Sequence, residues 1–522
     1  MMDTKALREK VLDLAIRGKL VPQDPNDEPA SVLLERIRQQ KQQMLKEGKL
    51  KAKDIKNDTV IFVGEDNLHY EKFADGSVKC IEDEIPFDLP DGWAWARLGN
   101  LSSAIQYGLS NSAESQGTHR LLRITDIQDR NVNWDTVPFT TVDDPDTYLL
   151  KSGDIVFART GATVGKSFLI TETPYPSVYA SYLIRIRLLG NLPPEYIYQF
   201  FNSACYWSQI TDKSVGVGQP NCNGTSLKEL FIPLPPINEQ LRIVPTAQAL
   251  LAYVAKIDTE KMSLLSIATA AKAKILDLAI RGQLVPQDPA DEPASVLLER
   301  IRAEKEDLIK QGKIKRDKKE SVIFRGEDNS YYEKIGTEVR CINHEIPFDL
   351  PETWCWCRLG TIFAHNTGKA LNSSDSAGIP MTYITTSNLY WDRFELDSLK
   401  EMPFTDSEID KCTVTKGDLL VCEGGDIGRS AIWMFDENIR IQNHIHRLRP
   451  YISLSSRFYY YVMYMWKQLG LIGGQGIGLQ GFSSKALHHL IVPLPSIDEQ
   501  ERIVDFVDEL FETIANIERS LS

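Results

Sequence analysis

The sequence predicts an α+β protein: two globular domains of mixed α/β structure, separated by long antiparallel, coiled-coil-like helices, with a pseudo-twofold internal repeat. Three observations support this prediction. Long stretches of sequence occur twice, about 260 residues apart. Segments rich in β-type runs lie between the repeated stretches. A stretch of about 44 residues in the middle of the chain has the apolar spacing of a helix.

The repeated stretches form two frames, each of which encloses an insert. VLDLAIRGKLVPQDPNDEPASVLLERIR at 11–38 returns as ILDLAIRGQLVPQDPADEPASVLLERIR at 275–302, and EIPFDLPDGWAWARLG at 84–99 returns as EIPFDLPETWCWCRLG at 345–360. Near the end of each copy, FIPLPPINEQLRIV (231–244) matches IVPLPSIDEQERIV (491–504). The inserts resemble one another only faintly. We expect the frames to share one task and the inserts to perform the same kind of task on different targets.

These borders predict seven segments. Each insert mixes short β-type runs, such as GDIVFART (153–160), with loops and is expected to form an α+β globule. The segments are an N-terminal helical region (1–38), a frame segment (39–99), a first insert domain (100–237), a central long helix with its repeat (238–302), a second frame segment (303–360), a second insert domain (361–497) and a C-terminal helix (498–522).

The central segment predicts a long helix that Gly282 can end. The N-terminal segment repeats the second half of this helix and the C-terminal segment repeats the first half, so the two ends make one split copy. Antiparallel packing of both ends against the central helix follows. Apolar residues at three-four spacing mark the contact faces: Leu12, Ile16, Leu250, Val254, Ile257, Leu264, Ile275, Leu278, Ile503, Val507, Leu510 and Ile514.

Composition limits the class of protein. The chain is 42% hydrophobic and 25% charged, as globular proteins are, and no apolar stretch is long enough for a membrane helix. Its start lacks the pattern of a secretory signal, and its eight cysteines form no disulfide framework, so we expect a cytoplasmic protein. The net charge of −13 argues against a polycation that coats nucleic acid. Any contact with DNA must therefore be local or shared with a partner.

The stretch FARTGATVGKS (157–167) resembles a phosphate-binding loop in its glycines and its Gly-Lys-Ser ending. A Walker loop places four residues between its first glycine and Gly-Lys, whereas only three separate Gly161 from Gly165. The counterpart VCEGGDIGRS in the second insert is shorter and has Arg429 in place of Lys166. A turn at a strand end that presents a cation to a DNA backbone fits both copies.

Taken together, the two frames, the split helical repeat, PLPPINEQLRIV with PLPSIDEQERIV, and KSGDIVFARTGATVGKS resemble the specificity subunit of type I restriction-modification systems. The resemblance covers essentially the whole chain. It implies that each insert is a target recognition domain that reads one half of a bipartite, asymmetric sequence in double-stranded DNA. It also implies that the long helices dock two methyltransferase subunits, which makes the apolar helix residues named above candidates for partner docking.

The same resemblance assigns all chemistry to partners. It implies no catalytic residue, no metal and no cofactor in this chain. S-adenosylmethionine, ATP and Mg belong to partner subunits, namely the methyltransferase for adenine-N6 methylation and restriction subunits for ATP-dependent DNA cleavage in host defence; no membrane partner is implied. The sequence agrees, because it contains no DPPY- or NPPF-type tetrapeptide.

Candidates for DNA contact carry basic or hydrogen-bonding side chains in the inserts, many of them in the glycine-spaced loops at 214–230 and 473–487. One departure is that Glu423 stands in the second insert where the first has Arg159. The alternatives are a nucleotide-binding enzyme built on GATVGKS and a coiled-coil scaffold for proteins only. The candidates are Arg123, Arg159, Thr160, Lys166, Gln219, Asn221, Asn223, Lys228, Thr385, Asn388, Arg429, Asn443, Gln475, Gln480 and Lys485.

Overall fold

The computed structural model describes residues 3–128, 130–213, 221–316, 320–370, 377–472 and 482–521. It divides into two compact units, an N-terminal unit (Met2–Lys261) and a C-terminal unit (Met262–Ser522). Both units mix helices and strands, as the α+β prediction required.

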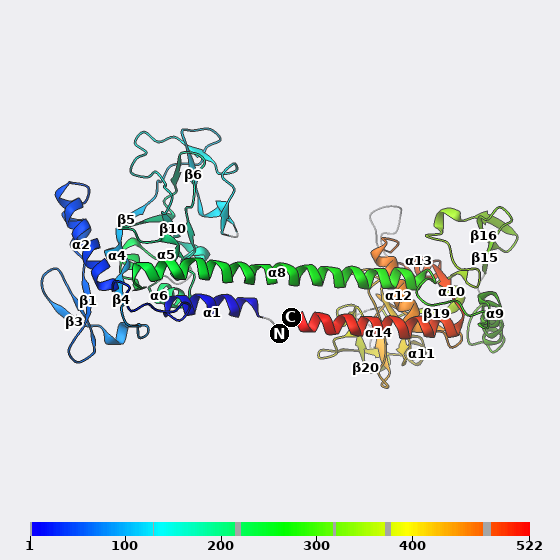
Figure 1. Cartoon of the computed structure of the whole chain (residues 1–522). Coiled ribbons are helices and arrows are strands. Elements are labelled where there is room, and N and C mark those ends of the chain that lie inside the picture. Colours follow the sequence, from blue (N-terminus) through cyan, green and yellow to red (C-terminus); the bar gives the residue numbers. More distant parts are fainter. Residues whose placement is uncertain are drawn as a thin grey trace. The chain divides into compact units, whose positions relative to one another are not determined.

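The long helix α8 (Ile237–Ile280) contributes its first part to the N-terminal unit and its last part to the C-terminal unit (Figure 1). It ends as predicted at Gly282, whose φ is +66° and whose N–H donates to the Ala279 carbonyl. A side chain at Gly282 would meet Pro351 Cγ at 2.6 Å, and one at Gly18 would meet Pro90 Cγ at 2.6 Å, so both copies of the frame need glycine at this turn.

The terminal helices lie antiparallel to α8, which confirms the prediction from the split repeat (Figure 1). In the N-terminal unit α1 (Thr4–Ile16) brings Arg8 within 3.3 Å of Asp258. In the C-terminal unit α14 (Ile497–Leu521) pairs Glu518 with Lys272 at 2.7 Å.

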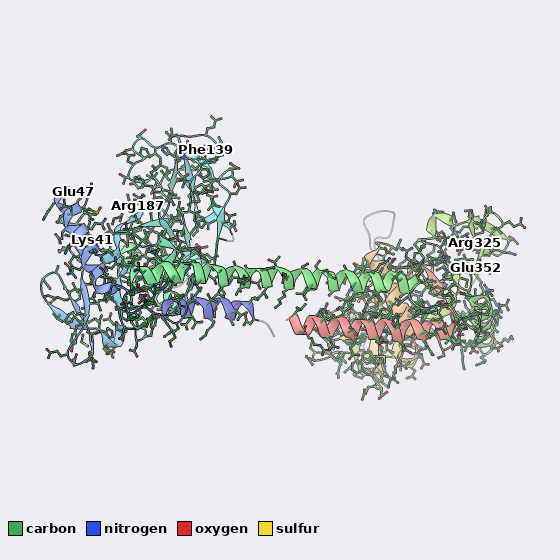
Figure 2. All side chains as sticks on the ribbon, in the orientation of Figure 1. Lys41, Glu47, Phe139, Arg187, Arg325 and Glu352 are labelled. Atoms are coloured by element: carbon green, nitrogen blue, oxygen red, sulfur yellow. The ribbon has the colours of Figure 1, made fainter. Side chains whose placement is uncertain are left out.

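Each frame continues with a helix and a three-stranded antiparallel sheet. In the N-terminal unit Lys41, labelled in Figure 2, is buried on the frame helix and donates to Asp58 at 2.9 Å and to the Gly99 carbonyl at 2.7 Å. The N-terminal frame consists of α2 (Ala30–Lys46), α3 (Ala52–Ile55), β1 (Val60–Val63), β2 (His69–Lys72) and β3 (Val78–Cys80), and the C-terminal frame of α9 (Ala294–Lys310), β15 (Ser321–Arg325), β16 (Tyr331–Ile335) and β17 (Glu338–Cys341).

Paired strands join each insert to its frame. In the N-terminal unit β4 (Ala94–Arg97), which leads into the insert, pairs antiparallel with β14 (Phe231–Leu234), which leads out. In the C-terminal unit β18 (Cys355–Arg358) pairs in the same way with β29 (Ile491–Leu494). The two ends of each insert therefore meet at one place on the frame.

Ion pairs and hydrogen bonds at these junctions occur in both copies. Glu71 accepts from Arg97 in one unit, and buried Glu333 accepts from Arg358 in the other. Burial alone would raise the pKa of Glu333, but hydrogen bonds from the neighbouring arginines lower that pKa to about 2. The indole of Trp354 donates to Glu499 at 2.8 Å, as the Trp93 indole does to Glu239 at 2.9 Å.

Both inserts are built around a four-stranded sheet with the same strand order, β11-β10-β13-β5 in the first and β26-β25-β28-β19 in the second. An ion pair with a buried aspartate supports each sheet: Arg187 contacts Asp154 at 2.6 Å, and Arg449 contacts Asp418 at 2.6 Å. The strands are β5 (Ser102–Tyr107), β10 (Ile155–Ala158), β11 (Ser167–Leu169), β13 (Leu183–Leu188), β19 (Phe363–Thr367), β25 (Leu419–Cys422), β26 (Ser430–Ile432) and β28 (Ile445–Pro450).

The inserts diverge outside this sheet. The first carries a three-stranded sheet in the order β12-β6-β9 and the second a four-stranded sheet in the order β23-β20-β27-β24. These strands are β6 (His119–Leu122), β9 (Phe139–Thr140), β12 (Ser177–Tyr179), β20 (Ile379–Ile384), β23 (Lys400–Phe404), β24 (Thr413–Val414) and β27 (Ile439–Ile441). Short two-stranded pairs are β7 (Ile127–Gln128) with β8 (Asn131–Val132) and β21 (Leu389–Tyr390) with β22 (Arg393–Phe394). The insert helices are α4 (Leu98–Leu101), α5 (Pro194–Phe200), α6 (Ala204–Lys213), α7 (Gly224–Lys228), α10 (Leu359–Ile362), α11 (Asp406–Cys412), α12 (Ser456–Gln468) and α13 (Ser484–His488).

Candidate nucleic-acid interface

The loop within FARTGATVGKS connects two antiparallel strands. β10 pairs with β11 so that Phe157 opposes Ser167, and a short 3-10 turn (Gly161–Thr163) lies between them. A phosphate-binding loop leads from a strand into a helix whose N-terminal N–H groups hold the phosphates. Here a strand follows instead, and in the second insert β25 and β26 form the same kind of hairpin. The helix that a nucleotide-binding loop requires is therefore missing after this loop, which counts against the nucleotide-binding alternative.

Arg159 lies at the centre of a small polar and aromatic surface in the first insert. Its guanidinium is stacked 4.8 Å from the ring centroid of Tyr107. Its main-chain N–H donates to the Tyr182 carbonyl at 3.1 Å, and its carbonyl accepts from Cys222 N–H at 3.0 Å. Thr160 forms a β-bridge with Asn221, whose side chain is exposed. We call these five residues, Tyr107, Arg159, Thr160, Tyr182 and Asn221, the Arg159 surface.

Asn223 is next to this surface, because Gly224 N–H donates to the Tyr107 hydroxyl at 2.9 Å. Its side chain caps α7 by accepting from Ser226 N–H at 2.9 Å. Lys166 is exposed at the end of the β10–β11 loop. Lys228, on α7, lines a separate depression of about 650 Å³ that also includes Lys213.

Arg123 has an intramolecular partner. Its guanidinium contacts the Asp126 carboxylate at 2.7 Å, and these hydrogen bonds raise the pKa of Arg123. A guanidinium that is already paired offers less net charge to a phosphate than an unpaired one.

The corresponding loop of the second insert has different chemistry. Glu423 occupies the place of Arg159, and its N–H donates to the His444 carbonyl at 2.9 Å. Arg429 donates to the Thr386 carbonyl at 2.5 Å and is stacked 5.0 Å from the ring centroid of Tyr390. Arg393 is stacked on the same ring at 4.9 Å, so two arginines share one aromatic side chain.

The remaining candidates of the second insert are scattered. Thr385 and Asn388 are buried, and Asn388 Oδ1 accepts from the Thr385 N–H at 2.9 Å. Asn443 is partly exposed, and its N–H donates to the Lys369 carbonyl at 2.9 Å. Lys485 is exposed on α13. Gln219, Gln475 and Gln480 lie outside the described residues.

Strand register reveals functional candidates that sequence patterns did not show. Tyr107 ends β5 and Tyr182 precedes β13, and the register of β10 with β13 and of β13 with β5 brings them to Arg159. In the second insert the register of β25 with β28 brings His444 to Glu423 in the same way, whereas Tyr390 ends β21 and contacts Arg429 by stacking. The sequence could show only that an aromatic residue stands at the end of a predicted strand. It could not show which other strand, and therefore which arginine, lies next to it.

The helix residues proposed to contact partners divide into three groups by their exposure to solvent. Leu12, Ile16, Val254, Ile503 and Val507 are buried, so they hold the helices together. Leu250 and Leu264 are exposed. Ile257, Ile275, Leu278, Leu510 and Ile514 are partly exposed.

The Arg159 surface can bind an anionic polymer through a cation, an amide and aromatic rings, the groups that contact phosphates and base edges in protein–DNA complexes. Within the described ranges, no group of three or more His, Cys, Asp or Glu side chains could hold a metal ion. In the same part of the chain, no helix has the length and apolar character needed to cross a bilayer.

Comparison with known proteins identifies the family. The family model described as "Type I restriction modification DNA specificity domain" matches residues 115–266 and again residues 351–522. The chain belongs to this family. The prediction of a DNA-recognition subunit of a type I restriction-modification system is thereby confirmed, and the two matches correspond to the internal repeat.

Individual relatives carry the same description. The chain is 26% identical to the type I restriction enzyme EcoAI specificity subunit of Escherichia coli, over 98% of this chain and 89% of that one. It is 30% identical to the EcoEI specificity subunit of Escherichia coli, over 69% of this chain and 62% of that one. Among solved structures, the HsdS subunit from Thermoanaerobacter tengcongensis matches 84% of this chain and 94% of its own, with 18% identity and a TM-score of 0.45.

Proposed function

We propose that this specificity subunit recognises a bipartite, asymmetric DNA sequence and that the insert of each unit reads one half of it. The observation that carries this proposal is the pair of inserts: the same four-stranded sheet is joined to the same frame in each unit, yet different side chains stand at the equivalent loop. The first insert presents Arg159 beside Tyr182, and the second presents Glu423 beside His444. Two inserts that are attached to their frames in the same way but carry different contact residues are suited to two half-sites of different sequence.

In the first insert the Arg159 surface contacts DNA. The Arg159 guanidinium binds a phosphate or a guanine edge, and the exposed amide of Asn221 is suited to an adenine edge. In the second insert Arg429 supplies the charge, since Arg393 is already paired with Glu395 at 3.1 Å. Because the whole chain carries a net charge of −13, partner subunits provide further phosphate contacts.

The frames and long helices dock two copies of an adenine methyltransferase subunit. The first part of α8 exposes Leu250 and Tyr253, and its last part exposes Leu264 and Ile267. Each pair lies three residues apart, so its members are neighbours on the helix surface, and contiguous exposed apolar side chains are typical of partner contacts. Methylation with S-adenosylmethionine, and restriction with ATP and Mg by restriction subunits, take place in the partners, and the complex acts in the cytoplasm.

The test is selection of DNA by the assembled complex. The chain is mixed with its methyltransferase subunit and random duplexes, and the retained duplexes are sequenced. A gapped, two-part motif is expected. Absence of any enriched motif while the methyltransferase is bound would favour a protein-only scaffold and contradict the proposal.

A further inference from the structure

The small sheets of the two frames, β1–β3 and β15–β17, each expose one face. In the first sheet Phe62 opposes Tyr70, and Tyr70 opposes Cys80, so their side chains share a face. In the second sheet Phe324, Tyr332 and Cys341 oppose one another in the same register. We call the faces that contain these residues the outer faces.

Each outer face is apolar and open to solvent. Phe62 is 40% exposed and Val78 52% exposed; their counterparts Phe324 and Val339 are 41% and 54% exposed. The aromatic pairs are stacked, with ring centroids 5.8 Å apart for Phe62 and Tyr70 and 5.9 Å apart for Phe324 and Tyr332. On the first sheet these residues line an open depression of about 380 Å³.

The opposite, inner faces are joined to the body of each unit. Ile61 packs into the cluster that contains Trp95, and Glu71 binds Arg97 at 2.6 Å. In the other unit Ile323 belongs to the core, and Glu333 binds Arg358 at 2.8 Å. Packing within the chain therefore restricts Ile61 and Glu71 and their counterparts most tightly. On the outer faces, the hydroxyl of Tyr70 donates to Asp66 at 2.7 Å and that of Tyr332 to Asp328 at 2.9 Å.

Nevertheless, the outer faces are the ones that are identical. All six outer positions carry the same residue in both copies: Val60, Phe62, Tyr70, Lys72, Val78 and Cys80 match Val322, Phe324, Tyr332, Lys334, Val339 and Cys341. On the inner faces the packed residues Ile61 and Glu71 recur as Ile323 and Glu333, but three less buried positions differ. There Val63, His69 and Lys79 are replaced by Arg325 (labelled in Figure 2), Tyr331 and Arg340.

Other exposed positions in the same frames have changed. On α2 the exposed residues Gln39, Gln40 and Gln43 correspond to Ala303, Glu304 and Asp307 on α9. Exposed residues that touch nothing are the most tolerant of substitution. An exposed apolar face that is the same in both copies therefore indicates one partner that binds twice.

The charged residues beside each outer face favour a protein, rather than DNA, as that partner. The turn beside each outer face carries two exposed carboxylates, Glu65 and Asp66 in one unit and Glu327 and Asp328 in the other. Carboxylates at this border repel DNA phosphates, whereas an aromatic and aliphatic centre with charged residues around it is typical of protein interfaces. The complementary surface presents apolar side chains, a basic group toward Asp66 and an acidic group toward Lys72.

We propose that each outer face docks one copy of the methyltransferase subunit, so that one chain binds two copies through the same contact. This inference rests on the proposed function, which supplies a partner present twice. It adds the surface on which that partner lies.

The experiment counts methyltransferase subunits per full-length chain by native mass spectrometry. The wild-type chain is expected to bind two. The double variant Phe62→Ser/Val78→Ser and the double variant Phe324→Ser/Val339→Ser are each expected to bind one, and the chain with all four substitutions none. The matched controls are Val63→Arg, on the inner face, and Leu68→Ser, in the turn. They install the residues of the other copy at exposed positions outside the outer face and are expected to leave two bound.

A second measurement uses the wild-type chain and does not depend on how a variant folds. Cys80 and Cys341 are exposed and lie on the outer faces. Their alkylation by N-ethylmaleimide is expected to slow at least tenfold when the methyltransferase subunit is added.

Three results would overturn the inference. Two bound subunits in the four-substitution variant, together with unchanged alkylation, would show that the partner docks elsewhere and would leave the proposed function intact. Protection of both cysteines in the chain alone, through self-association, would assign the faces to a second copy of this chain. No methyltransferase bound to the wild-type chain would refute the proposed function itself.

Discussion

Substitution of Arg159 by alanine isolates the contribution of one guanidinium to DNA binding. Both hydrogen bonds in which Arg159 anchors the loop, to Tyr182 and from Cys222, are main-chain bonds that alanine retains. The substitution removes only the cation stacked on Tyr107. The loop is therefore expected to keep its conformation.

The expected loss depends on what Arg159 contacts. If Arg159 contacts one phosphate, its loss makes the slope of log K against log salt shallower by about 0.9. Between 1 M and 0.15 M salt, this change lowers the binding constant by roughly 0.7 of a decade, which is about 1 kcal/mol of binding free energy. For a guanine edge, the loss is about 1 to 3 kcal/mol and discrimination at one base pair is relaxed. Arg159→Lys retains the phosphate contact but loses a bidentate base contact, so it separates the two cases.

The assay is fluorescence anisotropy of the assembled complex with its target duplex and with a scrambled duplex, at several salt concentrations. Arg123→Ala is the matched control, because Asp126 already neutralises that guanidinium, and a smaller change is expected. If Arg159→Ala left both the affinity and the salt slope of the wild type, the Arg159 surface would not be a DNA contact.

Further predictions concern stability and spacing. Arg358→Ala leaves buried Glu333 without its main partner and is expected to lower the free energy of unfolding by about 3 to 5 kcal/mol, measured by urea denaturation; an unchanged midpoint would contradict this. Burial, reinforced by nearby His446 and His488, lowers the pKa of His365 to about 3, so folding excludes a proton that the unfolded chain binds below about pH 6.5. The melting temperature of the C-terminal unit should therefore fall as the pH drops from about 7 toward 4, and His365→Asn should flatten this slope; an equally steep slope in the variant would refute the assignment. Insertion of four residues between 250 and 275 of α8 adds about 6 Å of helix and is expected to lengthen the gap in the selected DNA motif by roughly two base pairs, while an unchanged gap would show that α8 does not set it.

The sequence predicted the frames well because they are repeated and locally determined. Gly282 ends α8 where predicted, and the split repeat led directly to the antiparallel pairing of α1 and α14 with α8. In each case a short-range pattern or an internal copy contained the information.

The contact residues were harder to predict because they depend on long-range strand register. Arg159 could be singled out from its loop, but Tyr107 and Tyr182 reach it only through β5 and β13. Thr385 and Asn388 have suitable side chains, yet they close a buried turn. Likewise, only the strand that follows FARTGATVGKS distinguishes its hairpin from a nucleotide-binding loop.

Exchange of one insert tests the central claim most directly. β4 and β14 bring the two ends of the first insert together, so residues 100–230 can be replaced by the insert of another specificity subunit without altering the frame. DNA selected by the assembled hybrid complex is then sequenced. We predict that one half of the two-part motif changes while the other half and the gap remain those of the wild type. A change in both halves, or in neither, would contradict the assignment of one half-site to each insert.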